Sequence, residues 1–156
     1  MALFDSSREA AWRRLRDAST LLGGEFDEIG TWVPRFRGAS RHGGLAVWQA
    51  TLALEYIEEN LGAKLALRQL ANSAALSESH FSRAFNQSIG SSPLAYVMAR
   101  RVERAKLMMI STREGLADIA LACGFADQSH LTRSFRRIVG MNPGRWRRCT
   151  SIRRPT

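Results

Sequence analysis

Two segments of the chain, fifty residues apart, carry almost the same pattern of residues. Residues 79–93 read SHFSRAFNQSIGSSP, and residues 129–143 read SHLTRSFRRIVGMNP. The likeness extends upstream, where residues 67–79 match residues 116–129 with one additional residue in the turn of the second copy. A unit of about 30 residues that occurs twice restricts the fold strongly, because both copies must form the same supersecondary structure.

Each copy predicts a short helix, a tight turn and a second helix. The predicted helices cover about 67–74 and 78–89 in the first copy, and about 116–123 and 128–139 in the second. This is the outline of a helix-turn-helix unit. The residues predicted to face the core are Phe81, Phe85 and Ile89 in the first copy, and Leu131, Phe135 and Ile138 in the second. Beyond these helices Gly90, Pro93 and Tyr96 match Gly140, Pro143 and Trp146.

A long helix is predicted between the copies, from Pro93 to Ile110. Ser91 or Ser92 can cap its amino terminus, and Pro93 suits its first turn. Such a helix spans about 27 Å. With the width of each unit added, it can hold the two second helices about 34 Å apart, which is one turn of B-DNA. Its predicted apolar stripe comprises Leu94, Val97, Met98, Val102, Ala105 and Met109.

Two more helices are predicted upstream, over residues 45–61 and residues 6–22. The first ends at Gly62. Residues 23–44 contain six glycines and one proline, which predicts a loop with a short extended piece around TWVPRF. The strip predicted to face the core from residues 45–61 comprises Leu45, Trp48, Leu52 and Tyr56, with Ile57 beside it.

The net charge of +9 comes entirely from the carboxy-terminal part of the chain. Residues 93–156 hold 13 basic and 4 acidic side chains, and 12 of the basic ones are Arg. The planar Arg fork suits phosphate oxygens and guanine edges. We therefore predict a polyanionic partner, nucleic acid rather than a membrane, since no basic helix carries a large bulky apolar face. A merely soluble basic protein is the alternative.

The two cysteines, Cys123 and Cys149, predict no disulfide framework. The chain has no apolar run approaching 18 residues, and charged residues come too early for a signal peptide. These features predict an intracellular, cytoplasmic protein with reduced thiols. His and Cys residues are scattered without metal-ligand spacing, so neither a metal nor a cofactor is expected. Cys123 is predicted to be a small core residue.

The outward faces of the two second helices are polar and carry no carboxylate. Every outward side chain can donate a hydrogen bond, which favours a face that meets phosphates and base edges. The alternative is that Arg83 and Arg133 pack their stems on the core and pair with a nearby acid. The outward sets are Ser79, Ser82, Arg83 and Asn86 in the first copy, and Ser129, Thr132, Arg133 and Arg136 in the second.

Residues 116–148, LADIALACGFADQSHLTRSFRRIVGMNPGRWRR, strongly resemble the DNA-binding domain of the AraC/XylS family of bacterial transcription regulators. With RRVERAKLMM and the first copy before them, the resemblance covers about residues 45–148. It implies an all-α fold of about seven helices, with two helix-turn-helix modules joined by a long linker helix. It also implies helices inserted in adjacent major grooves, regulation of transcription, and RNA polymerase as a candidate partner.

The two modules that the resemblance implies differ in charge. In the second module the segment 127–148 carries a net charge of +5, whereas Glu78 and Arg83 cancel in the first. The second module is therefore expected to anchor the protein on DNA, and the first to bind more weakly or tune selectivity.

By the resemblance, the positions that match base-reading residues are Ser79, Ser82, Arg83, Gln128, Ser129, Thr132 and Arg133. The candidates for phosphates or for bases at the edge of the footprint are Asn86, Arg136, Arg137 and Arg147.

Two residues depart from the family pattern in the turns. Ala75 stands where the second copy has Gly124 and where the family usually has Gly. If that residue is left-handed, Ala costs on the order of 1 kcal/mol. Ala126 stands where a Ser commonly caps the following helix, and Asp127 can serve instead.

We divide the chain into an N-terminal extension (1–44), a DNA-binding domain (45–148) and a basic tail (149–156). Many family members carry a ligand-binding, dimerising β-rich domain before this domain, and so short an extension cannot form one. We therefore expect a stand-alone regulator without a small-molecule effector. A shortened relative, or a fragment of a larger ligand-sensing regulator, is the alternative.

The sequence thus predicts a sequence-specific regulator that binds double-stranded DNA, an activator associated with the nucleoid. A non-specific architectural DNA-binding protein is one alternative. An enzyme is the other, for example a DNA-repair protein whose Cys149 accepts an alkyl group. We disfavour an enzyme because Cys149 has no His or metal partner nearby in the sequence.

Overall fold

The computed structural model describes residues 24–26, 32–34 and 43–151. The helix predicted at residues 6–22 lies outside the described residues. In the predicted loop, β1 (Gly24–Phe26) pairs antiparallel with β2 (Trp32–Pro34). The extended piece expected around TWVPRF is therefore one strand of a small hairpin, which is added to an otherwise all-α fold.

Seven helices occupy residues 43–151, and this part of the chain confirms the predicted all-α architecture. Each predicted helix end lies within two residues of the observed one. The boundary predicted at residue 148 falls inside the last helix. The helices are α2 (Val47–Glu59), α3 (Leu67–Ser73), α4 (Glu78–Ile89), α5 (Pro93–Ser111), α6 (Leu116–Ala122), α7 (Gln128–Val139) and α8 (Pro143–Ser151).

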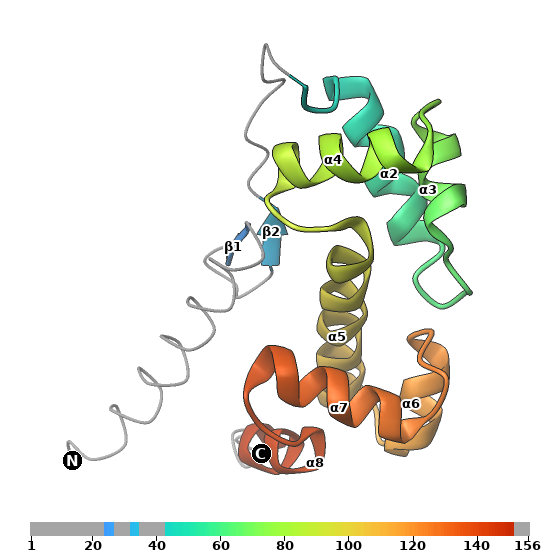
Figure 1. Cartoon of the computed structure of the whole chain (residues 1–156). Coiled ribbons are helices and arrows are strands. Elements are labelled where there is room, and N and C mark those ends of the chain that lie inside the picture. Colours follow the sequence, from blue (N-terminus) through green and yellow to red (C-terminus); the bar gives the residue numbers. More distant parts are fainter. Residues whose placement is uncertain (1–23, 27–31, 35–42, 152–156) are drawn as a thin grey trace, which may run out of the picture.

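The long helix α5 lies between two small modules (Figure 1). The first module contains α2, α3 and α4, and the second contains α6, α7 and α8. Each module has its own apolar core, and α5 contributes to both, with Tyr96 and Val97 in the first and Val102 and Met109 in the second. A single rigid helix therefore carries both modules.

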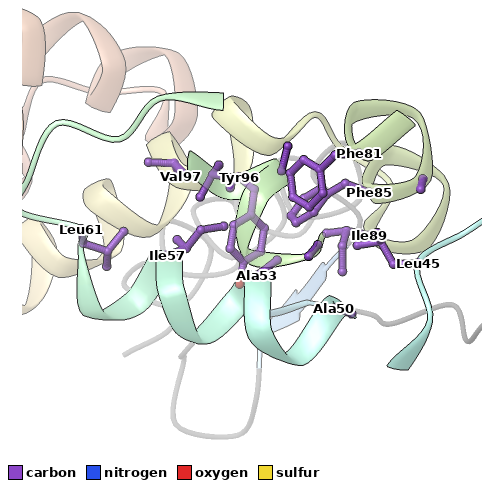
Figure 2. Close-up of a cluster of buried hydrophobic side chains, with 14 residues drawn as sticks. Leu45, Ala50, Ala53, Ile57, Leu61, Phe81, Phe85, Ile89, Tyr96 and Val97 are labelled. Atoms are coloured by element: carbon purple, nitrogen blue, oxygen red, sulfur yellow. The ribbon is translucent and has the colours of Figure 1, made fainter. Parts of the chain in front are cut away.

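The first core brings α2, α4 and the start of α5 together (Figure 2). Phe81, Phe85 and Ile89 are fully buried, as predicted. In the second core Leu131 and Phe135 are fully buried as well. The predicted third position is wrong by one residue, because Val139 is the buried residue at the end of α7 and Ile138 is only half-buried.

The contacts that close each module also repeat. The ring of Phe85 lies edge-on to Tyr96, with the ring centroids 5.6 Å apart. The equivalent rings of Phe135 and Trp146 are 5.8 Å apart in a similar edge-on arrangement. The two sequence copies are therefore two copies of one structural unit, including the helix that follows each helix-turn-helix.

Side chains cap α5 and α7 at the predicted places, and a serine caps α4. Ser92 Oγ accepts a hydrogen bond from the backbone N–H of Ala95 at the start of α5. Asp127 Oδ1 accepts one from the backbone N–H of His130, at 2.7 Å, and so begins α7 in place of the usual Ser. Ser77 caps α4 in the same way.

The predicted strip of residues 45–57 is confirmed in part. Leu45 and Ile57 are buried and Tyr56 is half-buried, but Trp48 and Leu52 are 55% and 44% exposed, and Ala50 and Ala53 are buried instead. Small alanine side chains let a neighbouring helix approach closely, so packing selects this face over the one with larger side chains. On α5 the predicted core residue Leu94 is likewise half exposed.

Candidate nucleic-acid interface

The helices α4 and α7 are equivalent in length, capping and termination. Each has 12 residues, begins directly after a side-chain cap and ends before a left-handed glycine, Gly90 or Gly140. Residues at the second, fifth and sixth positions of one helix therefore correspond to those of the other. These residues are Ser79, Ser82 and Arg83 in α4, and Ser129, Thr132 and Arg133 in α7.

In α4 the predicted base-reading residues lie on the surface of the module. Ser79 and Arg83 are exposed, and Ser82 is partly buried. Arg83 Nε donates to the carbonyl oxygen of Ser79 at 3.3 Å, which folds the side chain back along the helix. Its two terminal nitrogens, the ones that pair with phosphate or guanine, take no part in that bond. Asn86 is exposed one turn further along α4.

In α7 the equivalent surface is more basic. Thr132 Oγ1 donates to the carbonyl oxygen of Gln128 at 2.8 Å, so this hydroxyl can only accept a further hydrogen bond. Arg133, Arg136 and Arg137 are exposed, and within residues 43–151 none of their side chains makes a hydrogen bond or ion pair. Three uncompensated guanidinium groups on one helix give this face a strong positive potential.

Neither Arg83 nor Arg133 pairs with a carboxylate in the part of the chain that the structure describes. Two of the acidic side chains pair elsewhere, Glu58 with Arg100 and Glu103 with Lys106. This arrangement argues against the alternative in which the outward arginines serve packing alone. Figure 1 shows α4 near one end of α5 and α7 near the other, both running across it.

Arg147 has partners that the sequence did not predict. From α8 its Nη1 donates to the carbonyl oxygen of Glu114 at 2.7 Å, and its other nitrogens donate to those of Met109 and Thr112. These carbonyls lie at the end of α5 and in the loop before α6. Arg147 therefore ties α8 to the start of the second module, and its phosphate contact stays a prediction.

Comparison with known proteins places this architecture in a family. A model of a helix-turn-helix domain family matches residues 70–149, about half of the chain. The chain belongs to the AraC family of helix-turn-helix proteins.

Curated relatives match part of the chain. The chain is 35% identical over 91 residues to the probable transcriptional regulator LumQ of Photobacterium leiognathi, covering 58% of this chain and 37% of LumQ. It is 32% identical over 101 residues to the bifunctional transcriptional activator/DNA repair enzyme AdaA of Bacillus subtilis, covering 65% of this chain and 48% of AdaA. The chain thus spans less than half the length of these relatives.

A solved structure shares the AraC-type fold. The DNA-binding domain of the global transcriptional factor AdpA, in a crystal structure with a target DNA, matches with a TM-score of 0.65 and 28% identity. The match covers 70% of this chain and 97% of that domain. The two-module arrangement around α5 is therefore that of a known DNA-binding domain.

Sequence reasoning missed Arg101, an AraC-domain residue buried between the modules. Arg101 is 7% exposed and donates to the carbonyl oxygens of Leu61 and Ala63. The sequence does hold a sign of this burial, because Arg101 lies four residues from both Val97 and Ala105 on the apolar side of α5. A basic residue inside an apolar stripe indicates a buried, hydrogen-bonded charge.

Membrane-spanning helices, metal-binding clusters and the cysteines were the other features of interest among the described residues. Among them no helix is long and apolar enough to cross a membrane. No group of three or more His, Cys, Asp and Glu in the same part of the chain could hold a metal ion. Cys123 is fully buried and Cys149 is exposed.

Proposed function

We propose that this chain is a sequence-specific regulator of transcription that binds double-stranded DNA through α4 and α7, each in its own major-groove segment. One observation carries the proposal. Two equivalent helices, at the two ends of α5, carry Ser or Thr and Arg at matching positions, and the exposed Arg83 and Arg133 among them make no ion pair with a carboxylate of the described residues. The likeness to the DNA-bound AdpA domain supports it.

The chemistry of the side chains suggests a division of roles. The fork of Arg83 or Arg133 fits the O6 and N7 atoms of guanine, and the amide of Gln128 fits adenine. Ser79, Ser82, Ser129 and Thr132 can bond either base type, and the Thr methyl can contact thymine. Asn86, Arg136 and Arg137 are proposed to hold phosphates and fix the register on the duplex.

The two modules are proposed to contribute unequally. The face of α7 carries Arg133, Arg136 and Arg137, whereas α4 carries Arg83 with Glu78 in its first turn. Phosphate neutralisation supplies much of the affinity for DNA, so the second module anchors the protein. The first module then adds selectivity. Because one chain carries both recognition helices, its site need not be a palindrome.

We propose activation rather than repression, and AdaA, a relative named as a transcriptional activator, supports this direction. Contact with RNA polymerase, location at the nucleoid in the cytoplasm and the lack of an effector stay predictions. We also propose that the chain is not an alkyl-accepting enzyme, since the candidate thiol, Cys149, has no His or metal partner nearby in the sequence. The other thiol, Cys123, is fully buried, and burial raises its pKa to about 11.

Selection of bound sequences from a random duplex pool tests the proposed function. The expected motif has two half-sites whose centres lie about 10 base pairs apart. The selected site should bind at least about 1,000-fold more tightly than random duplex at the same salt concentration. A ratio near one would instead favour the non-specific architectural protein.

A further inference from the structure

The two modules touch each other directly as well as sharing α5. The segment 61–63 that follows α2 lies against the end of α6 at residues 122–124. A Cβ atom on Gly62 would lie 3.0 Å from the carbonyl oxygen of Ala122, and one on Gly124 would lie 2.3 Å from that of Leu61. The backbones of the two modules approach this closely because both positions are glycine.

The guanidinium of Arg101 lies at this junction. Its Nε is 2.9 Å from the carbonyl oxygen of Leu61, and its Nη2 is 2.6 Å from that of Ala63. Its Cζ would lie 2.9 Å from a Cβ on Gly124. One side chain of α5 therefore contacts the segment after α2 in the first module and the turn after α6 in the second.

Electrostatics explains why a charge is stable in this place. The carboxyl ends of α2 and α6 meet at the junction, and the carbonyl groups at helix ends attract a cation. Burial lowers the pKa of Arg101, which marks the cost of taking the charge out of water. Hydrogen bonds to Leu61 and Ala63 offset that cost only while the two segments keep their places around the guanidinium.

Arg101 lies on α5 near the border between the two cores. The first core uses α5 up to Val97, and the second core uses it from Met98 onward, with its first fully buried α5 residue at Val102. Without a contact at the border, each module would be held to α5 only by contacts on its own side, which are its core and polar links such as Glu58–Arg100 and Arg147–Met109. Domains joined through a small contact move relative to each other by default.

We propose that Arg101 is a positioning residue that fixes the orientation of α7 relative to α4, and so sets the spacing between half-sites that the protein accepts. The second part rests on the proposed reading of DNA by α4 and α7. One added base pair turns the second half-site by roughly 35° and moves it along the duplex, because a full turn takes about 10 base pairs. A rigid protein cannot follow that change, whereas a loosened one can.

Pulsed electron spin resonance on the full chain tests the first part without DNA. Spin labels are attached at Glu55→Cys in α2 and Ala117→Cys in α6, both exposed positions, with Cys149→Ser to remove the exposed native thiol. We expect one narrow distance distribution for the otherwise native chain. Arg101→Ala should broaden it about twofold or more, since free modules move relative to each other.

Two variants make this result specific. Arg101→Lys keeps the charge but has no fork for two carbonyls, so its distribution should be intermediate. Arg100→Ala is the matched control, because the ion pair of Arg100 joins α5 to Glu58 of α2 and does not connect the two modules. It should leave the distribution narrow. A folded Arg101→Ala protein with the native distribution would overturn the proposal.

A second variant serves if Arg101→Ala does not fold. Gly124→Ala keeps Arg101 but forces a Cβ against the junction, so the distance maximum should shift. Ala75→Gly changes the equivalent turn position of the first module, which is exposed, and should shift nothing. An unshifted distribution for Gly124→Ala would overturn the proposal as well.

Binding to selected duplexes tests the link to spacing. One base pair inserted between the half-sites should weaken native binding by on the order of tenfold or more, because both helices can no longer engage together. For Arg101→Ala the ratio of the affinities for the native and the lengthened spacing should fall toward one. The affinity of this variant for the native spacing should fall by a smaller factor than that ratio does. An undiminished ratio would overturn the spacing claim. If no duplex is selected at all, the proposed function fails, and the spin-label result still decides the positioning role.

Discussion

Ala75 and Gly124 occupy the same left-handed place in the two helix-turn-helix turns, with φ angles of 55° and 80°. The turns have the same hydrogen bonds, for the N–H of each residue donates to the carbonyl oxygen three residues earlier. Their surroundings differ. Ala75 is exposed, whereas Gly124 is pressed against the carbonyl of Leu61. The turn at residue 75 therefore has room for the methyl group of alanine, and the turn at Gly124 does not.

We predict opposite effects of exchanging these residues. Ala75→Gly should raise the free energy of unfolding by about 0.5 to 1 kcal/mol, because glycine adopts a positive φ without strain. Gly124→Ala should lower it by about 2 kcal/mol or more, since strain and overpacking act together. Urea unfolding followed by circular dichroism measures both. Equal losses in both variants would show that the surroundings of the two turns do not matter.

Much of the fold could be predicted from local patterns. The helices of each copy follow from apolar residues at steps of three and four, and Asp127 was recognised as a cap because the capping residue lies next to the helix it begins. The alanine part of the buried face of α2 could not be predicted that way. Ala50 and Ala53 are buried in the first core, while the larger Trp48 and Leu52, which dominate the apolar pattern, are exposed.

The candidate interface was predictable to a similar degree. Once Phe81 and Phe85 face inward, helix geometry places Ser79 and Arg83 on the outside, and the structure has them exposed. The partners of Arg147 were beyond such reasoning. Its carbonyl acceptors lie 33 to 38 residues away in the sequence, so only the packing of α8 brings them together.

For Arg147 we predict a loss of stability in addition to any loss of phosphate contact. Arg147→Ala removes three hydrogen bonds from a charged group to carbonyls, and should lower the free energy of unfolding by about 1.5 to 3 kcal/mol. Arg145→Ala, an exposed neighbour in α8, is the control and should change it by less than about 0.5 kcal/mol. Indistinguishable urea midpoints for the two variants would rule out the structural role.

Arg133 and Arg137 should differ in how their loss affects DNA binding. Arg133→Ala should weaken binding to the selected site by about 1 to 3 kcal/mol and relax selectivity at one or two base pairs. Arg137→Ala should weaken all sequences alike and make the slope of affinity against salt concentration shallower by about one. Titrations at several salt concentrations, with matched and mismatched duplexes, separate the two effects. Unchanged selectivity in Arg133→Ala would show that α7 is misassigned.

The two modules should also contribute unequally to the affinity for DNA. Arg83→Ala removes the one arginine of α4, whose charge is already balanced by Glu78, and so should cost less affinity than Arg133→Ala. Glu78→Gln offers the converse test, because it removes the carboxylate in the first turn of α4, next to the proposed DNA face, and should tighten binding to all sequences. Comparing the dissociation constants of these variants at one salt concentration checks the order. A larger loss in Arg83→Ala would make the first module the anchor.

The two thiols should react very differently. Burial raises the pKa of Cys123 to about 11, so at pH 8 only about one molecule in a thousand carries the reactive thiolate. In a titration with a chromogenic disulfide reagent, the exposed Cys149 of the native chain should therefore react rapidly and account for one equivalent of thiol. The second equivalent should react only after unfolding. Cys149→Ser should abolish the rapid phase. Incubation with alkylated DNA followed by mass spectrometry should show no added alkyl group, and a modified Cys149 would revive the DNA-repair alternative.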